Sequence, residues 1–473
     1  MERKGRHFRF LMLLKPECQF KEVSKGLQSW SDKKIRHINS QLVLVREILH
    51  QLEIVQDARV LAAGEIWLKN NLKKHCLASA SLKRTIARLR SRINWLKDGD
   101  VNTKLFQQHA RHRKRKNFIG KLVSEDQIYT NHADKASIID DFYNSLLGTH
   151  VDRENTVDLT ELGLNTHDLT KLDFPFTAEE VWRTIEQLPP DKAPGPDGFT
   201  GRFYRSCWSI IKDDIIAAIS AIWSRKFVNF EVLNTAFITL LPKVDSAERP
   251  KDFRPISLVH SFAKLVTKLL ANRLASRLQQ LVSPNQSAFI KGRFIQDNFM
   301  LVQQTARFLH QQKQPRILLK LDISKAFDSV SWPFLLEVMQ HLGFGPIWRD
   351  LVSGLLASSS TQVLLNGIPG NSIVHQRGLR QGDPLSPMLF ILVMDVLGHI
   401  VSKAANEGLL QPLSRRVLQH RISLYADDVV LFLRPEAGDI NLVMEILFLV
   451  MLRGLKPTFK RAVFYPSGVV TWS

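Results

Sequence analysis

Residues 422–432 read Ile-Ser-Leu-Tyr-Ala-Asp-Asp-Val-Val-Leu-Phe. Apolar β-forming residues flank a short polar centre, a pattern that predicts a β-hairpin with Asp427 and Asp428 at its tip. Aspartate is a poor strand former, and two adjacent carboxylates repel by roughly 1 kcal/mol at about 4 Å in water. A divalent cation removes that repulsion, so paired carboxylates that face a third across a cleft suit Mg²⁺. The alternative is a solvent-exposed turn, where aspartate is common.

A candidate for the third carboxylate lies in residues 316–328, which read Arg-Ile-Leu-Leu-Lys-Leu-Asp-Ile-Ser-Lys-Ala-Phe-Asp. Ile317–Leu321 form a predicted strand and a helix can begin at Ala326, so Asp322 stands at the strand exit, where its side chain can face a cleft. Two Mg²⁺ ions about 3.5–4 Å apart at such a site could activate a 3′-hydroxyl and neutralise a leaving pyrophosphate.

Residues 376–387 read Gln-Arg-Gly-Leu-Arg-Gln-Gly-Asp-Pro-Leu-Ser-Pro and precede an apolar helix. Two glycines and two prolines predict a turn whose backbone can approach a ligand closely. Pro387 suits the start of the helix and Ser386 the cap before it. Asp383 fits the turn and Asp395 falls inside the apolar helix, so neither has the strand-end setting of the third carboxylate.

The distribution of charge separates the N-terminal quarter of the chain from the rest. The 473 residues carry a net charge of +20; residues 1–120 hold 27 Lys/Arg against 10 Asp/Glu, and the remainder 38 against 35. This asymmetry indicates a polyanionic partner, nucleic acid before membrane, although a solvated charged helical region gives the same count. One basic run favours phosphate contact, or alternatively nuclear localisation: Arg111, His112, Arg113, Lys114, Arg115 and Lys116.

The amino-acid composition limits the class of protein and the cellular compartment in which it can reside. With 44% hydrophobic and 23% charged residues the chain can bury a core, which excludes wholesale disorder. Its three widely separated cysteines cannot build a disulfide framework or a cysteine-based zinc site and fit a reducing compartment. The longest apolar runs are shorter than the ~20 residues of a membrane span. We expect an intracellular protein, in the nucleus or cytoplasm, without membrane association.

Periodicity predicts two kinds of architecture along the chain. Apolar spacing and the absence of proline predict helices over residues 21–115, followed by a polar linker over residues 121–170. From Thr235 onward, short β-type runs alternate with amphipathic helices, which predicts an α+β domain. The four predicted segments are Phe237–Leu241, Lys264–Leu281, Ile317–Leu321 and Leu335–His341.

Taken together, these patches resemble the reverse transcriptases of non-LTR (LINE-type) retrotransposons, in the form common in plants. Tyr425–Asp428 is similar to the family's YADD box, Asp322 with Phe327 to its first catalytic motif, and residues 380–387 to its RQGDPLSP box. Four further blocks occur in the family's order: residues 95–103, 192–198, 253–258 and 286–293.

The resemblance implies a right-hand polymerase, of palm and fingers, that copies an RNA template onto a DNA primer from deoxynucleoside triphosphates. It implies that Asp322, Asp427 and Asp428 are the catalytic acidic residues and hold two Mg²⁺ ions together with the carbonyl of Ile323. It places Tyr425 against nucleic acid.

The same resemblance assigns a nucleotide pocket. Phe327 takes the place of the steric gate that excludes a ribonucleotide's 2′-hydroxyl, although an ordinary core phenylalanine is the simpler interpretation. Gln381 and Gly382 would line the incoming nucleotide and the template base. Arg254 and Lys264 would hold the triphosphate.

These expectations give a domain plan. Residues 1–120 form a basic, mostly helical extension, residues 121–170 the linker, and residues 171–473 fingers and palm with a motif core at 235–465. Only 45 residues follow Asp428, so we expect most of the thumb to be missing. The competing hypothesis is a catalytically inactive, retrotransposon-derived protein that still binds nucleic acid.

Overall fold

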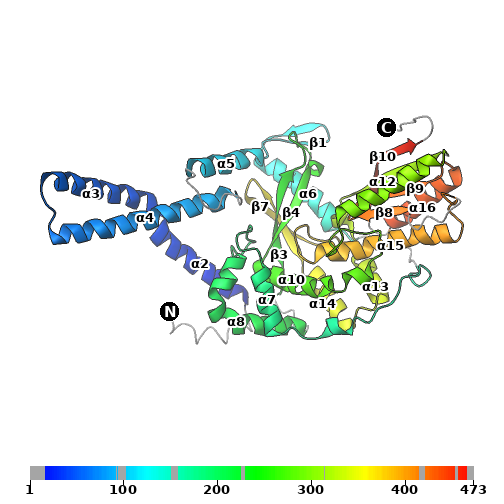
Figure 1. Ribbon diagram of the computed structural model, residues 1–473, viewed down its shortest axis with the longest axis horizontal. Coiled ribbons are helices and arrows are strands. Elements are labelled where there is room, and N and C mark those ends of the chain that lie inside the picture. The colour runs from blue at the N-terminus through cyan, green and yellow to red at the C-terminus, as the bar shows by residue number, and fades with distance from the viewer. Residues whose placement is uncertain are drawn as a thin grey trace. The chain divides into compact units, whose positions relative to one another are not determined.

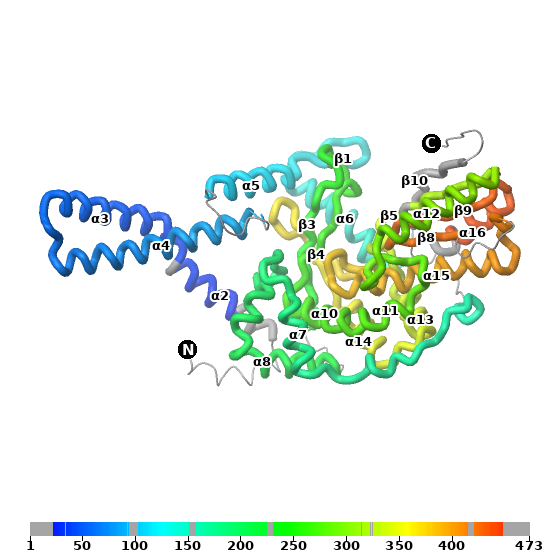
Figure 2. The backbone as a smooth tube through the Cα atoms, in the orientation of Figure 1, coloured from blue at the N-terminus to red at the C-terminus, as the bar shows by residue number. Residues whose placement is uncertain are grey.

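The structure, a computed structural model, describes residues 16–91, 93, 103–150, 158–224, 230–313, 315–414, 421–452 and 456–465. The side chains of Asp322 and Ser324, and those from residue 448 onward, lie outside this description. The chain divides into two compact units, Phe10–Gly120 and a larger one that contains Lys121–Ser473. Figures 1 and 2 trace the backbone of each.

The described part of the unit Phe10–Gly120 consists mainly of four helices. α3 and α4 run side by side as a hairpin (Figure 1), and Leu42 and Val45 of the predicted apolar stripe are buried. Ala87, Ile93 and Phe106 form a small core where α4 meets α5. The helices are α2 (Pro16–Ile35), α3 (Ile38–Ala58), α4 (Ala63–Ser91) and α5 (Thr103–Lys116).

The larger unit contains two four-stranded sheets. The first is antiparallel, in the order β10-β5-β9-β8, and the second has the order β4-β3-β6-β7 with one parallel pair, β3 with β6. The strands of the first sheet are β5 (Arg316–Ser324), β8 (Ile422–Tyr425), β9 (Asp428–Leu433) and β10 (Lys456–Tyr465). Those of the second are β3 (Thr235–Pro242), β4 (Phe253–Val259), β6 (Ser360–Leu365) and β7 (Ile368–Val374).

Helices cover both faces of the first sheet. α12 (Ile295–Gln311) packs Leu309 against Phe432 on one face, and on the other Leu424 meets Gly398 of α15 (Ser386–Asn406). Figure 1 shows β8 and β9 between these two helices. By length and composition α15 could cross a membrane, but 67% of its apolar window is buried, as in a core helix.

The remaining elements complete the larger unit and its core. They are β1 (Leu122–Ser124), β2 (Gln127–Tyr129), α6 (His132–Leu147), η2 (Thr170–Asp173), α7 (Ala178–Gln187), α8 (Gly201–Trp223), α9 (Phe230–Leu233), η3 (Pro250–Asp252), α10 (Ser261–Ala275), α11 (Leu278–Leu281), η4 (Phe327–Ser329), α13 (Trp332–His341), α14 (Pro346–Ala357) and α16 (Ala437–Leu452). The alternation predicted from Thr235 onward is confirmed, and the architecture is α+β.

Two local expectations differ from the structure. The segment 121–170 was expected to be a polar linker, but it contributes a β-hairpin and α6, which buries Ile139, Tyr143 and Leu147. Ser386 does not cap α15, because it is the first residue of that helix. The Asp383 carboxylate accepts the Leu385 and Ser386 N–H groups at 2.8 and 3.3 Å and satisfies the helix start instead.

Candidate active site

The predicted hairpin forms, with Asp427 in its turn and Asp428 opening β9. Tyr425 pairs with Asp428 across the strands. Ala426 has φ +54°, a left-handed conformation that disfavours a side chain by roughly 1–2 kcal/mol. The turn brings a half-buried Asp427 next to an exposed Asp428. A strained alanine at this point has to be held by its surroundings.

The third aspartate lies on the adjacent strand. Asp322 of β5 is the direct cross-strand partner of Asp428, and its side chain lies outside the described residues. Ile323 follows on β5 and is buried, at 3% exposure. Lys320, two residues before Asp322, pairs with Asp428 at 3.2 Å, Nζ to Oδ1. Residues two apart on a strand share a face, so Lys320, Asp322 and Asp428 belong to one face of the sheet.

The donor set at this end of the sheet fits a hard divalent cation. Two cross-strand aspartates and a third in the adjoining turn supply carboxylate oxygens, the ligands Mg²⁺ prefers. Among the described side chains, which do not include that of Asp322, no three His, Cys, Asp or Glu groups gather as a metal cluster. Support for the site comes instead from the strand register, which places Asp322 opposite Asp428. Asp322, Asp427 and Asp428 would hold the metal, which would stabilise developing negative charge on phosphate oxygens.

Phe327 stands in a tight turn after β5. Its ring stacks on that of Phe390 with centroids 4.3 Å apart and planes 18° from parallel. Phe390, on α15, is fully buried, whereas Phe327 is half-buried. The Phe327 carbonyl accepts the Leu379 N–H at 2.6 Å. The stacking on buried Phe390 thus fixes the Phe327 ring, which remains partly exposed.

Gln381 and Gly382 lie against the same turn and against β4. The Gln381 carbonyl accepts the Ser257 N–H at 2.9 Å, and its Nε2 lies 3.5 Å from an Asp328 oxygen. Gly382 has φ +104°, and a Cβ there would lie 3.2 Å from the Ser257 carbonyl. Gln381 thus lies beside Asp328, the residue that follows Phe327, and Gly382 lies against β4.

Asp328 is a buried carboxyl that the sequence reasoning missed. Burial raises the pKa of Asp328 to about 7, although the charges of Lys325 and Lys243 and the Gln381 hydrogen bond oppose the rise. Tyr143 of α6 lies close enough for Asp328 to contribute to raising the tyrosine pKa. Nothing local in the sequence signals this burial, because α6 comes from a segment expected to be a linker.

We expect Asp328→Asn to flatten the pH dependence of stability. Because the folded-state pKa lies above the usual value of about 3.9, the folded chain keeps a proton that the unfolded chain releases between about pH 4 and 7. Its free energy of unfolding therefore falls as pH rises through that window, by up to about 1.4 kcal/mol per pH unit. Urea unfolding across this range measures the slope. Asp141→Asn, at an exposed α6 position, is the control, and equal slopes in both variants would contradict the assignment.

Arg254 and Lys264 occupy different surroundings. Arg254 is exposed on β4, opposite Leu241 of β3. Lys264 of α10 is partly buried, and burial together with the like charge of Lys192 lowers its pKa, while Asp383 and Asp197 act in the opposite direction. Lys264 is thus close to the 192–198 loop as well as to the turn that contains Asp383.

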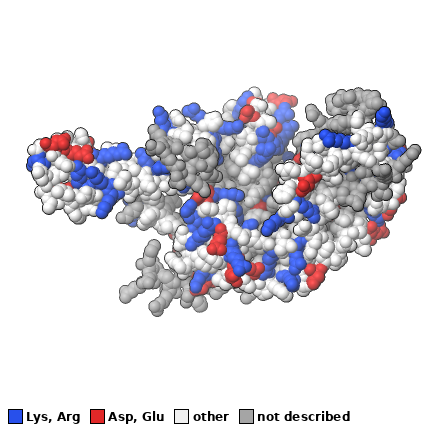
Figure 3. All heavy atoms as spheres, in the orientation of Figure 1, with Lys and Arg blue, Asp and Glu red and all other residues white. Residues whose placement is uncertain are grey.

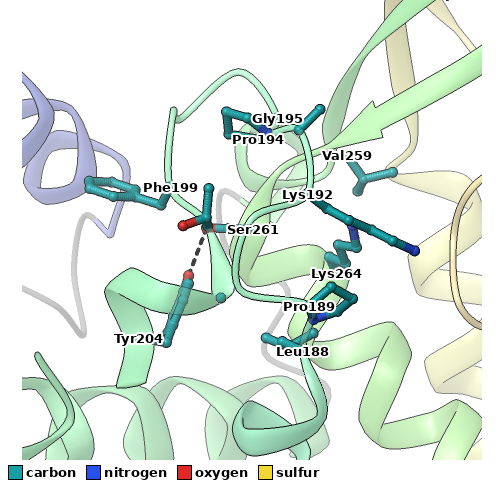
Figure 4. A pocket seen from close by; sticks show the side chains of 13 residues that line it. Leu188, Pro189, Lys192, Pro194, Gly195, Phe199, Tyr204, Val259, Ser261 and Lys264 are labelled. Carbon is teal, nitrogen blue, oxygen red and sulfur yellow. Dashed lines mark hydrogen bonds between the residues drawn. The ribbon is translucent and has the colours of Figure 1, made fainter. Parts of the chain in front are cut away.

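Figure 4 shows the pocket that Lys264 and Lys192 line, between the loop, β4 and α10. The Tyr204 hydroxyl and Ser261 Oγ are hydrogen-bonded at 2.8 Å beneath it. Gly195 presses on the end of β4, since a Cβ there would lie 2.2 Å from the Val259 carbonyl oxygen. A side chain at this position would displace the loop that carries Lys192.

The basic run maps to the other unit. Arg111, Arg113, Lys114, Arg115 and Lys116 are exposed on α5, and the last four occupy its final turn. Tyr425, by contrast, is half-buried in the hairpin itself.

Three aspartates meet at one end of the antiparallel sheet, two as cross-strand partners and one in the adjoining turn. Residues 241–453 match the family described as reverse transcriptase (RNA-dependent DNA polymerase). Over these residues the chain is similar to reverse transcriptases, and the relatives described below are proteins of transposons and retrotransposable elements. The three aspartates and the residues that the sequence assigns to a nucleotide pocket fall within the matched range.

Three relatives illustrate the similarity. The Xenopus laevis transposon TX1 uncharacterized 149 kDa protein is 30% identical over 261 residues, 55% of this chain and 20% of its own length. The Drosophila melanogaster Pol polyprotein from retrotransposable element R2DM is 30% identical over 293 residues, 60% and 26% of the two chains. The RNA-directed DNA polymerase from mobile element jockey, also of Drosophila melanogaster, is 26% identical over 269 residues, 55% and 28%. The chain thus spans roughly a fifth to a quarter of the first two relatives.

Proposed function

We propose that this chain is an RNA-directed DNA polymerase that extends a DNA primer on an RNA template from deoxynucleoside triphosphates. One observation carries the proposal: the strand register sets Asp322 opposite Asp428, next to Asp427 in the hairpin turn. Carboxylates from two strands and a turn at one sheet end suit in-line transfer to a primer 3′-hydroxyl. Two Mg²⁺ ions, when bound, would supply the charge stabilisation.

The chain's own residues then have separate roles. Asp322, Asp427 and Asp428, with the Ile323 carbonyl, orient the reacting oxygens; Phe327 blocks a 2′-hydroxyl; Gln381 and Gly382 support the nucleotide and template base. Arg254 and Lys264 hold phosphate, and Tyr425 contacts the primer strand. Lys320, which pairs with Asp428, can balance that carboxylate's charge before metal and substrate arrive.

We propose a division of labour between the two units. Residues 1–120 act as a basic arm that binds template or primer backbone, residues 171–473 act as fingers and palm, and the intervening segment joins them. Figure 3 shows Lys and Arg more widely than Asp and Glu along the α3–α4 hairpin. The excess charge of residues 1–120 supports this role. The separated cysteines support a reducing compartment, the nucleus or cytoplasm.

Primer extension tests the proposed activity. We expect the purified chain to lengthen a labelled DNA primer annealed to RNA, with Mg²⁺ and deoxynucleoside triphosphates, and to stop on chelation of the metal. Tight binding to the same primer–template without extension would favour the non-catalytic hypothesis. If the chain neither bound the primer–template nor extended the primer, both hypotheses would be contradicted.

The arm makes a second prediction about salt. Lys114→Gln with Arg115→Gln is expected to reduce the slope of log binding constant against log salt by about one to two, since each neutralised phosphate contributes roughly 0.7–0.9. Lys171→Gln with Lys212→Gln removes two exposed charges from the other unit and serves as the control. Titration of labelled RNA–DNA duplex by fluorescence anisotropy gives both slopes. An unchanged slope in the α5 variant would contradict the arm's role.

A further inference from the structure

The turn that presents Asp427 is held by a side chain from far along the chain. Gln286, in the loop before α12, is fully buried. Its Oε1 accepts the Ala426 N–H at 3.1 Å and the Ala288 N–H at 3.0 Å. Ala426 is the residue with φ +54°, and it is itself buried. A buried N–H without an acceptor is costly. The Gln286 oxygen supplies the acceptor for the N–H of buried Ala426.

The backbone around Gln286 extends the first sheet beyond β8. Gln286 makes a parallel bridge to Leu424, the Leu424 N–H donates to the Asn285 carbonyl at 2.9 Å, and the Ser287 N–H donates to the Leu424 carbonyl at 3.3 Å. Asn298 of α12, also buried, donates from Nδ2 to the Leu424 carbonyl at 2.6 Å. The backbone that carries Gln286 is thus held against β8, while the side-chain amide is held through its oxygen and its Nε2 is buried without a partner.

We infer that Gln286 is a positioning residue for catalysis: its amide oxygen sets the Ala426 peptide and, through it, the position of the Asp427 carboxylate. Alanine at positive φ does not hold this turn by itself. Without the acceptor, the peptide can rotate toward water and carry Asp427 away from Asp322. The expected effect on catalysis rests on the proposed function. The expected effect on the conformation of the turn rests on the contacts alone.

Amide exchange tests the structural step without metal or substrate. Gln286→Met keeps length and apolar volume but removes the acceptor, so hydrogen–deuterium exchange of a peptide over residues 422–428 is expected to quicken by about five- to tenfold. A peptide from α14 should exchange as in the wild type. Gln304→Met makes the same replacement at an exposed position of α12 and should leave the turn unchanged. Unaltered exchange of the 422–428 peptide in Gln286→Met would overturn the inference.

Kinetics test the catalytic step. A displacement of about 1 Å at a reacting group can cost roughly 10²-fold in rate, so kcat of Gln286→Met should fall about 10²-fold. The KM for nucleotide and the affinity for primer–template should stay within about threefold, because no binding contact is removed. An active Gln286→Met enzyme with the wild-type kcat would overturn the inference. If the wild-type chain extends no primer, the proposed function fails. The exchange experiment then still decides whether Gln286 holds the Ala426 peptide.

Two further variants separate positioning from folding. Gln286→Glu keeps an acceptor oxygen in both protonation states, so exchange of the 422–428 peptide should stay near that of the wild type at low pH, where the buried carboxyl is protonated. If Gln286→Met does not fold, this variant decides the question, and exchange well above the wild type at low pH would count against the inference. In an Ala426→Gly background, glycine adopts positive φ without strain, so the loss from Gln286→Met should shrink to about tenfold or less.

Discussion

Asp427→Asn should reduce primer extension by about 10³-fold or more, because a neutral amide binds a divalent cation more weakly than a carboxylate and does not balance its charge. The substitution keeps the size of the side chain, and the Ala426 N–H keeps its hydrogen bond to Gln286. Affinity for the RNA–DNA duplex should therefore remain near that of the wild type. Single-turnover extension at saturating enzyme measures the chemical step.

The control for this prediction is Asp141→Asn, which removes one negative charge from an exposed position on α6. It should extend primers like the wild type. If Asp427→Asn retained the wild-type rate, the hairpin would be a solvent-exposed turn and the site would lie elsewhere. Equal losses in both variants would indicate a general charge effect.

Phe327→Val should raise the use of ribonucleotides relative to deoxyribonucleotides by about 10²-fold, the scale on which a pocket of fixed shape rejects one extra hydroxyl. The Phe327 ring is half-buried, and the following residue, Asp328, lies beside Gln381. Valine removes the ring but keeps an apolar side chain. The ratio of kcat/KM for the two nucleotides measures the effect.

Phe390, the buried residue on which Phe327 stacks, provides a second test of nucleotide discrimination. Phe390→Leu leaves the gate in place but removes the aromatic ring on which Phe327 stacks. A stacked pair contributes about 0.5–1.5 kcal/mol, so discrimination should weaken by about fivefold rather than 10²-fold. Phe174→Val, at an exposed position, is the control. Wild-type discrimination in Phe327→Val would mean that Phe327 is an ordinary packing residue.

The sequence predicts the local elements of this site well. Alternating apolar residues around Asp427, and the strand before Asp322, produce the hairpin and β5 where expected, since both patterns are short-range. What the patterns cannot give is register. That Asp322 lies opposite Asp428 depends on pairing between strands about a hundred residues apart, which local propensity does not encode.

The sequence also does not predict contacts between side chains on elements that lie far apart in the chain. Gln286 and Asp328 carry no local signal, because the burial of each is created by elements far along the chain, the hairpin for Gln286 and α6 for Asp328. Lys264 was assigned to the triphosphate, and its closeness to Lys192 emerges only when the 192–198 loop folds over α10. The failed cap at Ser386 has a similar cause, because Asp383 satisfies the amides that a cap would serve.

The order of strands in the first sheet has a consequence for biosynthesis. β5 lies between β9 and β10, both of which are translated about a hundred residues or more after it. Pairing over such separations is slow, and a strand without neighbours is prone to aggregate. The edges of β5 thus stay open on the ribosome until the later strands emerge, and a chaperone that covers Arg316–Ser324 during that interval would improve the yield of folded protein.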